Sequence, residues 1–269
     1  MKKIAVVGSS GPLGVLITGH LRLMGYEVEE FSRRGKNSFD VTELSDYEKF
    51  QGFNSIVYLA WDSNDRSMKN QMEHANAAIQ FSKECLKYSV RTVFISSTLA
   101  GPDAQSAYGK AKYVAENGII ENEGVILRVG LVCDDAFPLL SSRMRHSGII
   151  RLIARANIPI GLFPVSGNQV AKYLDLSLSN SPPRTRYWLA NRRRVSLKRV
   201  VLYPLGNFET KSFSLANRIT KPLNFFAKVL PSIDRISGII AGPTEVPSDC
   251  QTFSQDSNSD TWAENFVRS

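Results

Sequence analysis

The sequence contains few cysteines and histidines and no long apolar run. Its three cysteines are far apart and odd in number, which favours a reducing compartment such as the cytoplasm over a disulfide framework. The three histidines lack the spacing of metal ligands, so we predict no metal site and expect the histidines at surface or structural positions. No apolar run approaches the roughly 20 residues of a membrane span, and the first residues do not resemble a signal peptide. We therefore expect a cytoplasmic globular protein.

The positive charge is concentrated in the second half of the chain. The formal net charge is +8, and residues 141–235 carry 17 of the 33 lysines and arginines against three acidic residues. Such a region suits a small polyanionic substrate, for example a sugar nucleoside diphosphate, although scattered solubilising charge explains the same composition. No nucleic-acid-binding motif accompanies the arginine run at 192–194, so we do not predict a nucleic-acid partner.

Strand-like and helical segments alternate along the first half of the chain. This order predicts an α/β fold, a Rossmann-type doubly wound parallel sheet with helices on both faces. Strands are predicted over 3–7, 27–31, 55–60, 91–96 and 124–132, and helices over 13–24, 43–50, 68–88 and 107–121. We divide the chain into a dinucleotide-binding domain (1–135), a small substrate-binding region interleaved with it (136–242) and a flexible tail (243–269).

Fewer elements are predicted after residue 135. Residues 143–156 have a basic helical pattern, and Tyr187 to Leu189 form a late strand-like run. Residues 222–242 are apolar but interrupted by charges and a proline. We expect them to form helices that pack on the body rather than an interfacial membrane element, so contact with a membrane surface is not favoured.

A glycine-rich turn links the first predicted strand to the first predicted helix. Its sequence is Gly8-Ser9-Ser10-Gly11-Pro12-Leu13-Gly14, with the spacing G-x-x-G-x-x-G. Glycines allow a tight turn and a close approach of backbone to ligand, and the helix N-terminus offers N–H groups and a positive dipole end to a pyrophosphate. A glycine turn between a strand and a helix therefore predicts dinucleotide binding.

A tyrosine and a lysine lie four residues apart in the helix predicted over 107–121. At this spacing Tyr108 and Lys112 leave the same helix face. A lysine ammonium favours the phenolate and lowers the tyrosine pKa, so the pair can exchange the proton of a carbonyl/alcohol couple. The preceding strand ends in hydroxyl side chains, of which Thr98 is the first candidate and Ser97 the second for binding the substrate oxygen.

Together these motifs resemble the extended or atypical short-chain dehydrogenase/reductases, most nearly the NAD-dependent epimerase/dehydratase group that acts on nucleotide sugars. The resemblance covers roughly residues 1–200. It implies a Rossmann fold, an NAD(P) cofactor and hydride transfer on a nucleotide-linked sugar, as in polysaccharide biosynthesis. It also implies that Tyr108 gives or takes the hydroxyl proton, while Lys112 tunes the tyrosine and bonds the nicotinamide ribose. Residues 167–174 resemble the helix that this family places near its substrate.

The cofactor is expected outside the carboxyl ends of the parallel strands, where ligands bind in such sheets. In the resembling family, an Asp-hydrophobic pair contacts adenine and a helical asparagine fixes backbone or water near the active site. An N-cap for the following helix is an equal interpretation of Asp40. The residues assigned to the cofactor are Gly8, Ser10, Gly11, Pro12, Leu13, Gly14, Ser32, Arg33, Arg34, Asp40, Val41, Leu59, Ala60, Trp61, Asn76, Ser96, Tyr108, Lys112, Val129 and Gly130.

The turn after the second predicted strand bears on the choice between NADP and NAD. Arg33 and Arg34 suit a 2′-phosphate, because guanidinium groups form charge-assisted fork hydrogen bonds with it. We therefore predict NADP as the preferred cofactor over NAD. If the strand ends two residues earlier, Glu29 or Glu30 becomes the acid that accepts from the ribose 2′-OH of NAD.

Three hypotheses for the function follow. The leading one is an NADP-dependent reductase or epimerase acting on a nucleotide-linked sugar, which we also expect to form a homodimer. The second is a non-catalytic dinucleotide-binding regulator or assembly factor, which the short loop from Thr98 to Tyr108 favours and the intact Tyr108/Lys112 pair opposes. The third is an enzyme that acts on a lipid-linked or non-sugar ketone at a membrane surface.

Overall fold

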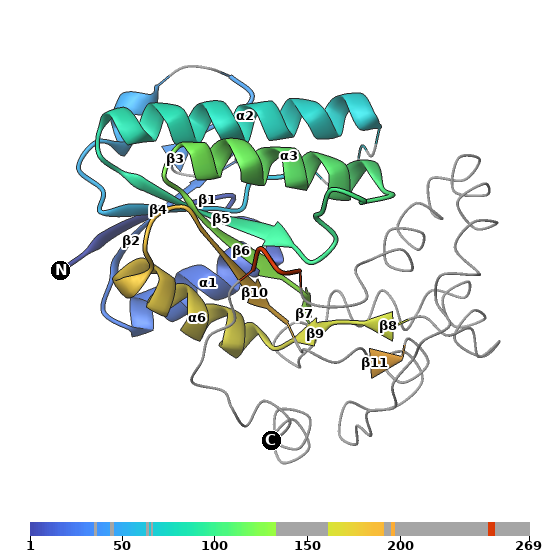
Figure 1. The fold of residues 1–269 in the computed structure, drawn as a ribbon. Helices are drawn as coiled ribbons and strands as arrows, with labels where there is room; N and C mark the ends of the chain where they lie inside the picture. The colour runs from blue at the N-terminus through green and yellow to red at the C-terminus, as the bar shows by residue number, and fades with distance from the viewer. Residues whose placement is uncertain are drawn as a thin grey trace, which may run out of the picture.

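A parallel β-sheet forms the centre of the molecule (Figure 1). The computed structural model of the chain describes residues 1–34, 37–43, 46–62, 65, 67–132, 161–190, 195–196 and 247–250. Within these residues the main sheet has seven strands in the order β10-β6-β5-β4-β1-β2-β3. They are β1 (Lys3–Val7), β2 (Glu27–Ser32), β3 (Asn37–Ser38), β4 (Ser55–Tyr58), β5 (Arg91–Ser97), β6 (Val125–Val129) and β10 (Thr185–Leu189). The strand order reverses between β1 and β4, so the predicted doubly wound α/β fold is confirmed.

Helices cover both faces of this sheet (Figure 1). Helices α2 and α3 pack together on one face, and α1 and α6 pack together on the other. Their bounds are α1 (Pro12–Leu23), α2 (Met68–Lys87), α3 (Ala107–Glu121) and α6 (Gly167–Asn180). Local sequence explains where three of them begin, because Ser67, Ser106 and Ser166 each accept a hydrogen bond from a first-turn N–H at 3.0–3.2 Å.

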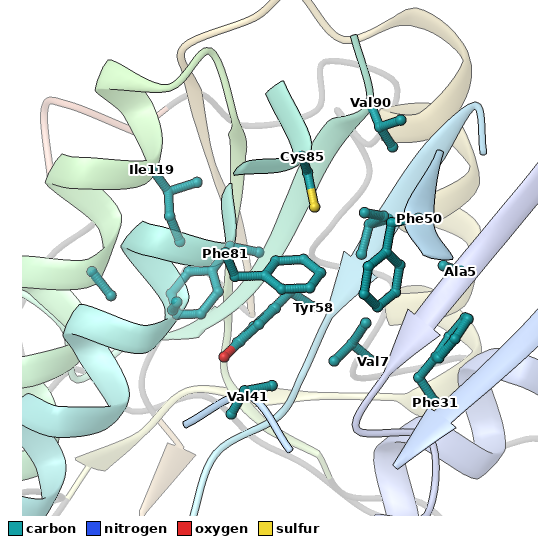
Figure 2. Packing of buried hydrophobic residues seen from close by; sticks show 14 of the residues in the cluster. Ala5, Val7, Phe31, Val41, Phe50, Tyr58, Phe81, Cys85, Val90 and Ile119 are labelled. Atoms are coloured by element: carbon teal, nitrogen blue, oxygen red, sulfur yellow. The ribbon is translucent and has the colours of Figure 1, made fainter. Parts of the chain in front are cut away.

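An aromatic core lies between the sheet and the α2/α3 layer (Figure 2). Phe81 of α2 contacts the rings of Phe50 and Tyr58 at centroid distances of 5.0 and 5.1 Å. Cys85, one turn further along α2, is fully buried beside them, as expected of a small apolar residue. The other face buries mainly Val, Ile and Leu against α1 and α6. Both faces of the sheet are therefore apolar, as a parallel sheet requires.

The structure differs from the predicted elements at three places. The predicted helix over 43–50 is wrong: in its described part only a single 3-10 turn, η1 (Tyr47–Phe50), is present. Asp46 precedes it with φ 67°, a left-handed backbone through which a right-handed helix cannot run. The predicted strand 55–60 ends at Tyr58, and the predicted strand 124–132 is divided at Gly130 into β6 and β7.

Four further strands form two small pairs outside the main sheet. Strand β7 (Leu131–Val132) pairs in parallel with β9 (Pro164–Val165), and β8 (Gly161–Leu162) pairs antiparallel with β11 (Val195–Ser196). Helix α6 and strand β10 belong to the layers of the main body, so the body extends beyond the predicted boundary at residue 135. The segments predicted as helices over 143–156 and 222–242 lie outside the described residues.

The C-terminal region makes contact with the body at its described residues. Asp249 forms an ion pair with Arg128 of β6 at 3.2 Å, and the Arg128 guanidinium also donates to Cys250 Sγ at 3.2 Å. The expectation of a flexible tail from residue 243 is therefore wrong at residues 247–250. These contacts are polar, and a prediction based on the small number of apolar residues in the tail could not detect them. None of the helices in the described segments combines the length and apolarity of a membrane span.

Candidate functional site

The glycine turn brings β1, the start of α1 and the end of β4 into close contact. Gly8 has φ +93° and its N–H donates to Phe31 O at 2.8 Å. A Cβ on Gly8 would lie 2.6 Å from Ala60 N, and a Cβ on Gly14 would lie 2.5 Å from Gly8 O. Only glycine fits at these two positions. Gly11 is the N-cap of α1 without a side-chain cap, so no side chain of the cap occupies the first N–H groups of the helix.

The remaining residues of the turn follow from this backbone path. Pro12 occupies the first turn of α1, where its fixed φ suits a helix start. Ser10 is exposed, whereas Leu13 packs against the apolar layer on the α1 face. The turn thus presents backbone and a small polar side chain outward, which is the arrangement that a phosphate group requires.

The end of β2 bears on the choice between the acids and the arginines considered above. The strand ends at Ser32, whose hydroxyl donates to Arg34 O at 2.9 Å, and Arg33 and Arg34 are exposed in the following turn. Glu29 pairs with Lys3 at 3.1 Å, and Glu30 pairs with Arg22 at 2.6 Å.

The two acids are thus engaged by other partners, and the strand does not end early enough to place either at its tip. This arrangement favours the arginines as the residues nearest a 2′-substituent.

Asp40 caps a turn rather than a helix. Its Oδ1 accepts hydrogen bonds from the Thr42 N–H at 3.0 Å and from the Thr42 hydroxyl at 2.8 Å. Burial raises the pKa of Asp40, but these hydrogen bonds and the nearby Arg33 outweigh it and lower the pKa below its usual value. The N-cap interpretation is wrong because η1 begins only at Tyr47. The following Val41 is buried in the aromatic core.

Tyr108 and Lys112 project from α3 as predicted, but the lysine is buried. Lys112 is 3% exposed, and its Nζ donates to Ile95 O at 3.0 Å. The ammonium lies 4.0 Å from the centroid of the Trp61 ring and 5.8 Å from that of Tyr108. Burial lowers the pKa of Lys112 to about 7, against the opposing charge of Glu116. The lysine can therefore change its charge near neutral pH.

The three hydroxyls at the end of β5 have different surroundings. Ser96 is buried, and its Oγ donates to Glu116 Oε1 at 2.6 Å, so its hydroxyl serves the protein rather than the site. Ser97 is half-buried, and its Oγ accepts from the Leu99 N–H at 3.2 Å. Thr98 is buried, and its N–H donates to Val129 O at 3.1 Å. Thr98 stays the first candidate for the substrate oxygen and Ser97 the second.

Trp61 lies at the centre of the site. Its ring meets that of Tyr108 edge to face at 6.1 Å and 84°, and that of His74 at 5.8 Å. His74 is buried, its Nδ1 has no partner within the described residues, and burial lowers its pKa. The indole Nε1 donates to Gln71 Oε1 at 2.8 Å. Sequence reasoning missed Gln71 and His74, although both share the helix face of the buried Ala75 and Ala78.

Three assigned residues do not face this cluster. Asn76 is exposed on α2, and helical geometry turns it about 200° around the helix from His74, so it does not face the cluster around Trp61. Val129 and Leu59 pack with the apolar layer on the opposite face of the sheet. A Cβ on Gly130 would overlap the carbonyl oxygen of Phe163, so close packing of β6 against the β9 segment explains this glycine.

A buried charge cluster ties α3 to the sheet, and sequence reasoning also missed it. Glu116 of α3 is fully buried and accepts three hydrogen bonds from Arg128 of β6 at 2.7–3.0 Å. Arg186 of β10 lies 3.5 Å from the same carboxylate. This cluster fixes α3, and with it Tyr108 and Lys112, against β5 and β6. In the described segments no group of three or more His, Cys, Asp or Glu residues is arranged to hold a metal ion.

Comparison with solved structures identifies the fold. MoeE5, in a complex with UDP-glucose and NAD, is 19% identical over 74% of this chain and 79% of its own, with a TM-score of 0.60. A UDP-N-acetylglucosamine 4-epimerase from Bacillus cereus is 15% identical (74% and 83% covered, TM-score 0.61). A UDP-glucose 4-epimerase from Thermus thermophilus, complexed with NAD, is 16% identical (74% and 81% covered, TM-score 0.59).

At the level of sequence, no protein-family model and no curated protein matches the chain. The similarity to the solved structures is therefore a similarity of three-dimensional fold at low identity. It covers about three quarters of this chain (74%) in each of the three comparisons. The chain therefore has the fold of these three proteins.

Proposed function

We propose that the protein binds NADP or NAD at the carboxyl edge of its sheet and transfers hydride to or from a nucleotide-linked sugar. The observation that carries the proposal is that the neighbouring residues 60 and 61 connect two motifs that lie far apart in the sequence. The glycine turn packs on Ala60, and the next residue, Trp61, packs on both Tyr108 and Lys112. A phosphate-binding turn and an acid–base pair thus share one edge of the sheet.

The chemistry assigns a separate task to each side chain. A bound nicotinamide supplies the hydride donor or acceptor. Tyr108 gives or takes the hydroxyl proton, and Thr98, with Ser97 as the alternative, binds the substrate oxygen. In its charged form Lys112, close to Tyr108 in a site largely closed to water, favours the phenolate. The fit of the residues to the cofactor is supported by Gly8 and Gly14, which leave backbone with no side chain at the turn.

Two features support the finer parts of the proposal. The exposed Arg33 and Arg34 after β2 favour NADP over NAD, because Glu29 and Glu30 are paired elsewhere. The UDP-glucose and UDP-glucuronic acid bound in the similar MoeE5 structures support a nucleotide-linked sugar as substrate. Whether the reaction is a reduction or an epimerisation depends on the substrate that the site accepts.

The test is turnover by a tyrosine variant. Wild-type protein is screened with nucleotide-linked 4-keto sugars and NADPH, whose consumption is followed by absorbance. Tyr108→Phe removes the acid and keeps the ring, so it should reduce turnover by about 10²–10⁴-fold with little change in NADPH affinity. Tyr113→Phe is the matched control, because Tyr113 lies on the same helix but on a different face. Retention of most of the rate by Tyr108→Phe would contradict the mechanism.

One observation favours the second candidate function, a non-catalytic dinucleotide-binding protein. Lys112 donates to Ile95 O and lies beneath Trp61, so its ammonium is covered in this arrangement. If wild-type protein binds NADPH and turns over none of the sugars in a broad screen, this second function replaces the first.

A further inference from the structure

Trp61 is held in a single orientation by a buried glutamine. Gln71 is fully buried, and its Oε1 accepts the hydrogen bond of the indole Nε1 at 2.8 Å. Its Nε2 donates to the carbonyl oxygens of Asp62 at 3.0 Å and Asp65 at 2.6 Å. Both amide protons and the amide oxygen of Gln71 are therefore engaged. The glutamine cannot rotate without losing these bonds, and the indole plane is fixed with it.

The face of the same indole covers the ammonium of Lys112. The Nζ atom lies 4.0 Å from the Trp61 ring centroid and 4.4 Å from that of Phe94, and it donates to Ile95 O. These distances are within the range of cation–π attraction. The edge-to-face contact of Trp61 with Tyr108 means that one side chain touches both members of the acid–base pair.

We propose that Trp61, oriented by Gln71, is the positioning residue of this site: its indole face holds the Lys112 ammonium, excludes water from it and sets its place relative to Tyr108. The catalytic meaning of this role rests on the proposed function, whereas the contacts themselves do not. Trp61 acts through Lys112 and Tyr108 and needs no contact with the reacting atoms.

Two effects of Trp61 on the charge of Lys112 oppose each other, and their magnitudes decide the sign. Cation–π attraction favours the ammonium, and at a desolvated site it corresponds to roughly 1.5 pH units. Burial favours the neutral amine and is the largest cause that lowers the pKa from 10.5 to about 7. The charged or titratable neighbours are Glu116 and Tyr108 on α3 and His74 on α2. Uncovering the ammonium should therefore raise the pKa of Lys112.

The experiment measures that pKa directly by NMR of lysines labelled with ¹³C at Cε, in the full chain without cofactor. The Lys112 resonance is identified by its loss in Lys112→Met. Lys49→Met is the control for assignment, since Lys49 also lies over a ring, that of Phe39 at 5.3 Å, but is partly exposed. Trp61→Ala should raise the pKa of Lys112 by at least one pH unit.

Two conservative variants separate positioning from folding. Trp61→Phe keeps an aromatic face and should leave the pKa of Lys112 near its wild-type value. Gln71→Met keeps the volume but removes the hydrogen bond to the indole Nε1, so it should raise the pKa of Lys112. If Trp61→Ala folds and the pKa of Lys112 stays within half a pH unit or falls, the proposal is wrong. If Trp61→Ala does not fold, an unchanged pKa in Gln71→Met overturns it.

A second measurement separates this proposal from the proposed function. NADPH affinity of the wild-type protein is measured by fluorescence titration. NADH affinity is measured in the same way. A failure to bind either NADPH or NADH would overturn the proposed function, and a rise of the Lys112 pKa in Trp61→Ala would still support the positioning of Lys112 by Trp61. If the wild-type protein binds NADPH and the pKa of Lys112 is unchanged in Trp61→Ala, the proposed function is supported and the positioning role of Trp61 is overturned.

Discussion

Replacing Glu116 by glutamine is expected to destabilise the fold by about 3–5 kcal/mol, because it removes the carboxylate that neutralises a buried arginine. The side chains of Glu116 and Arg128 are 0% and 1% exposed and lie 2.7 Å apart. Glutamine keeps the shape but carries no charge and one acceptor oxygen fewer. Asp249, at 3.2 Å from Arg128, is 41% exposed and compensates the arginine only in part.

Burial rather than distance determines this magnitude, and a surface pair provides the matched control. The Arg22–Glu30 pair is equally short at 2.6 Å, but its side chains are 53% and 40% exposed. Glu30→Gln should therefore change the free energy of unfolding by about 0–1 kcal/mol. The double variant Glu116→Met/Arg128→Met removes both charges. Its loss of unfolding free energy should be smaller than the sum of the losses in Glu116→Met and Arg128→Met alone.

Urea denaturation followed by circular dichroism measures these differences. Each variant is compared with wild type by its midpoint and by the slope of the transition, which must stay constant for the free energies to be comparable. If Glu116→Gln and Glu30→Gln lowered stability by the same amount, the argument from burial would be refuted. Additive losses in the double variant would show that the two buried charges do not act as a pair.

Three further predictions concern the site. Gly14→Ala should destabilise the protein and weaken NADPH binding because its Cβ meets backbone, whereas Gly19→Ala, which meets nothing within 4 Å in the same helix, should stabilise by about 0.5–1 kcal/mol; unfolding curves that show the same sign for both would contradict this. Calorimetric titration should find tighter binding of NADPH than of NADH, and Arg33→Ala/Arg34→Ala should remove that preference. An unchanged preference in this variant would contradict the role of the two arginines. Because burial lowers the pKa of Lys112 to about 7 from 10.5 in the unfolded chain, the unfolded state binds more protons between these values. The free energy of unfolding should thus rise with pH over that window, and Lys112→Met should lose this rise; equal pH dependence in both proteins would refute it.

Local sequence patterns determined most of the fold. The strands and helices of the parallel sheet followed from alternation of apolar runs, and the glycine turn between β1 and α1 was located by its residues alone. Local hydrogen bonds fix the helices and the turn, and runs of apolar, β-branched residues favour the strands, so a short window of sequence contains the information. The predicted helix over 43–50 failed because Asp46 takes a left-handed backbone that the apolar pattern does not record.

Only the tertiary structure decided how the site is assembled. Residues 61, 71 and 112 lie on three separate elements, and nothing local to any of them predicts that Gln71 orients Trp61 over Lys112. The same is true of Glu116, which takes up the hydroxyl of Ser96 and the guanidinium of Arg128. These contacts arise because packing of α2 and α3 on one face of the sheet buries polar groups, and a buried polar group must find its partner wherever the fold brings one.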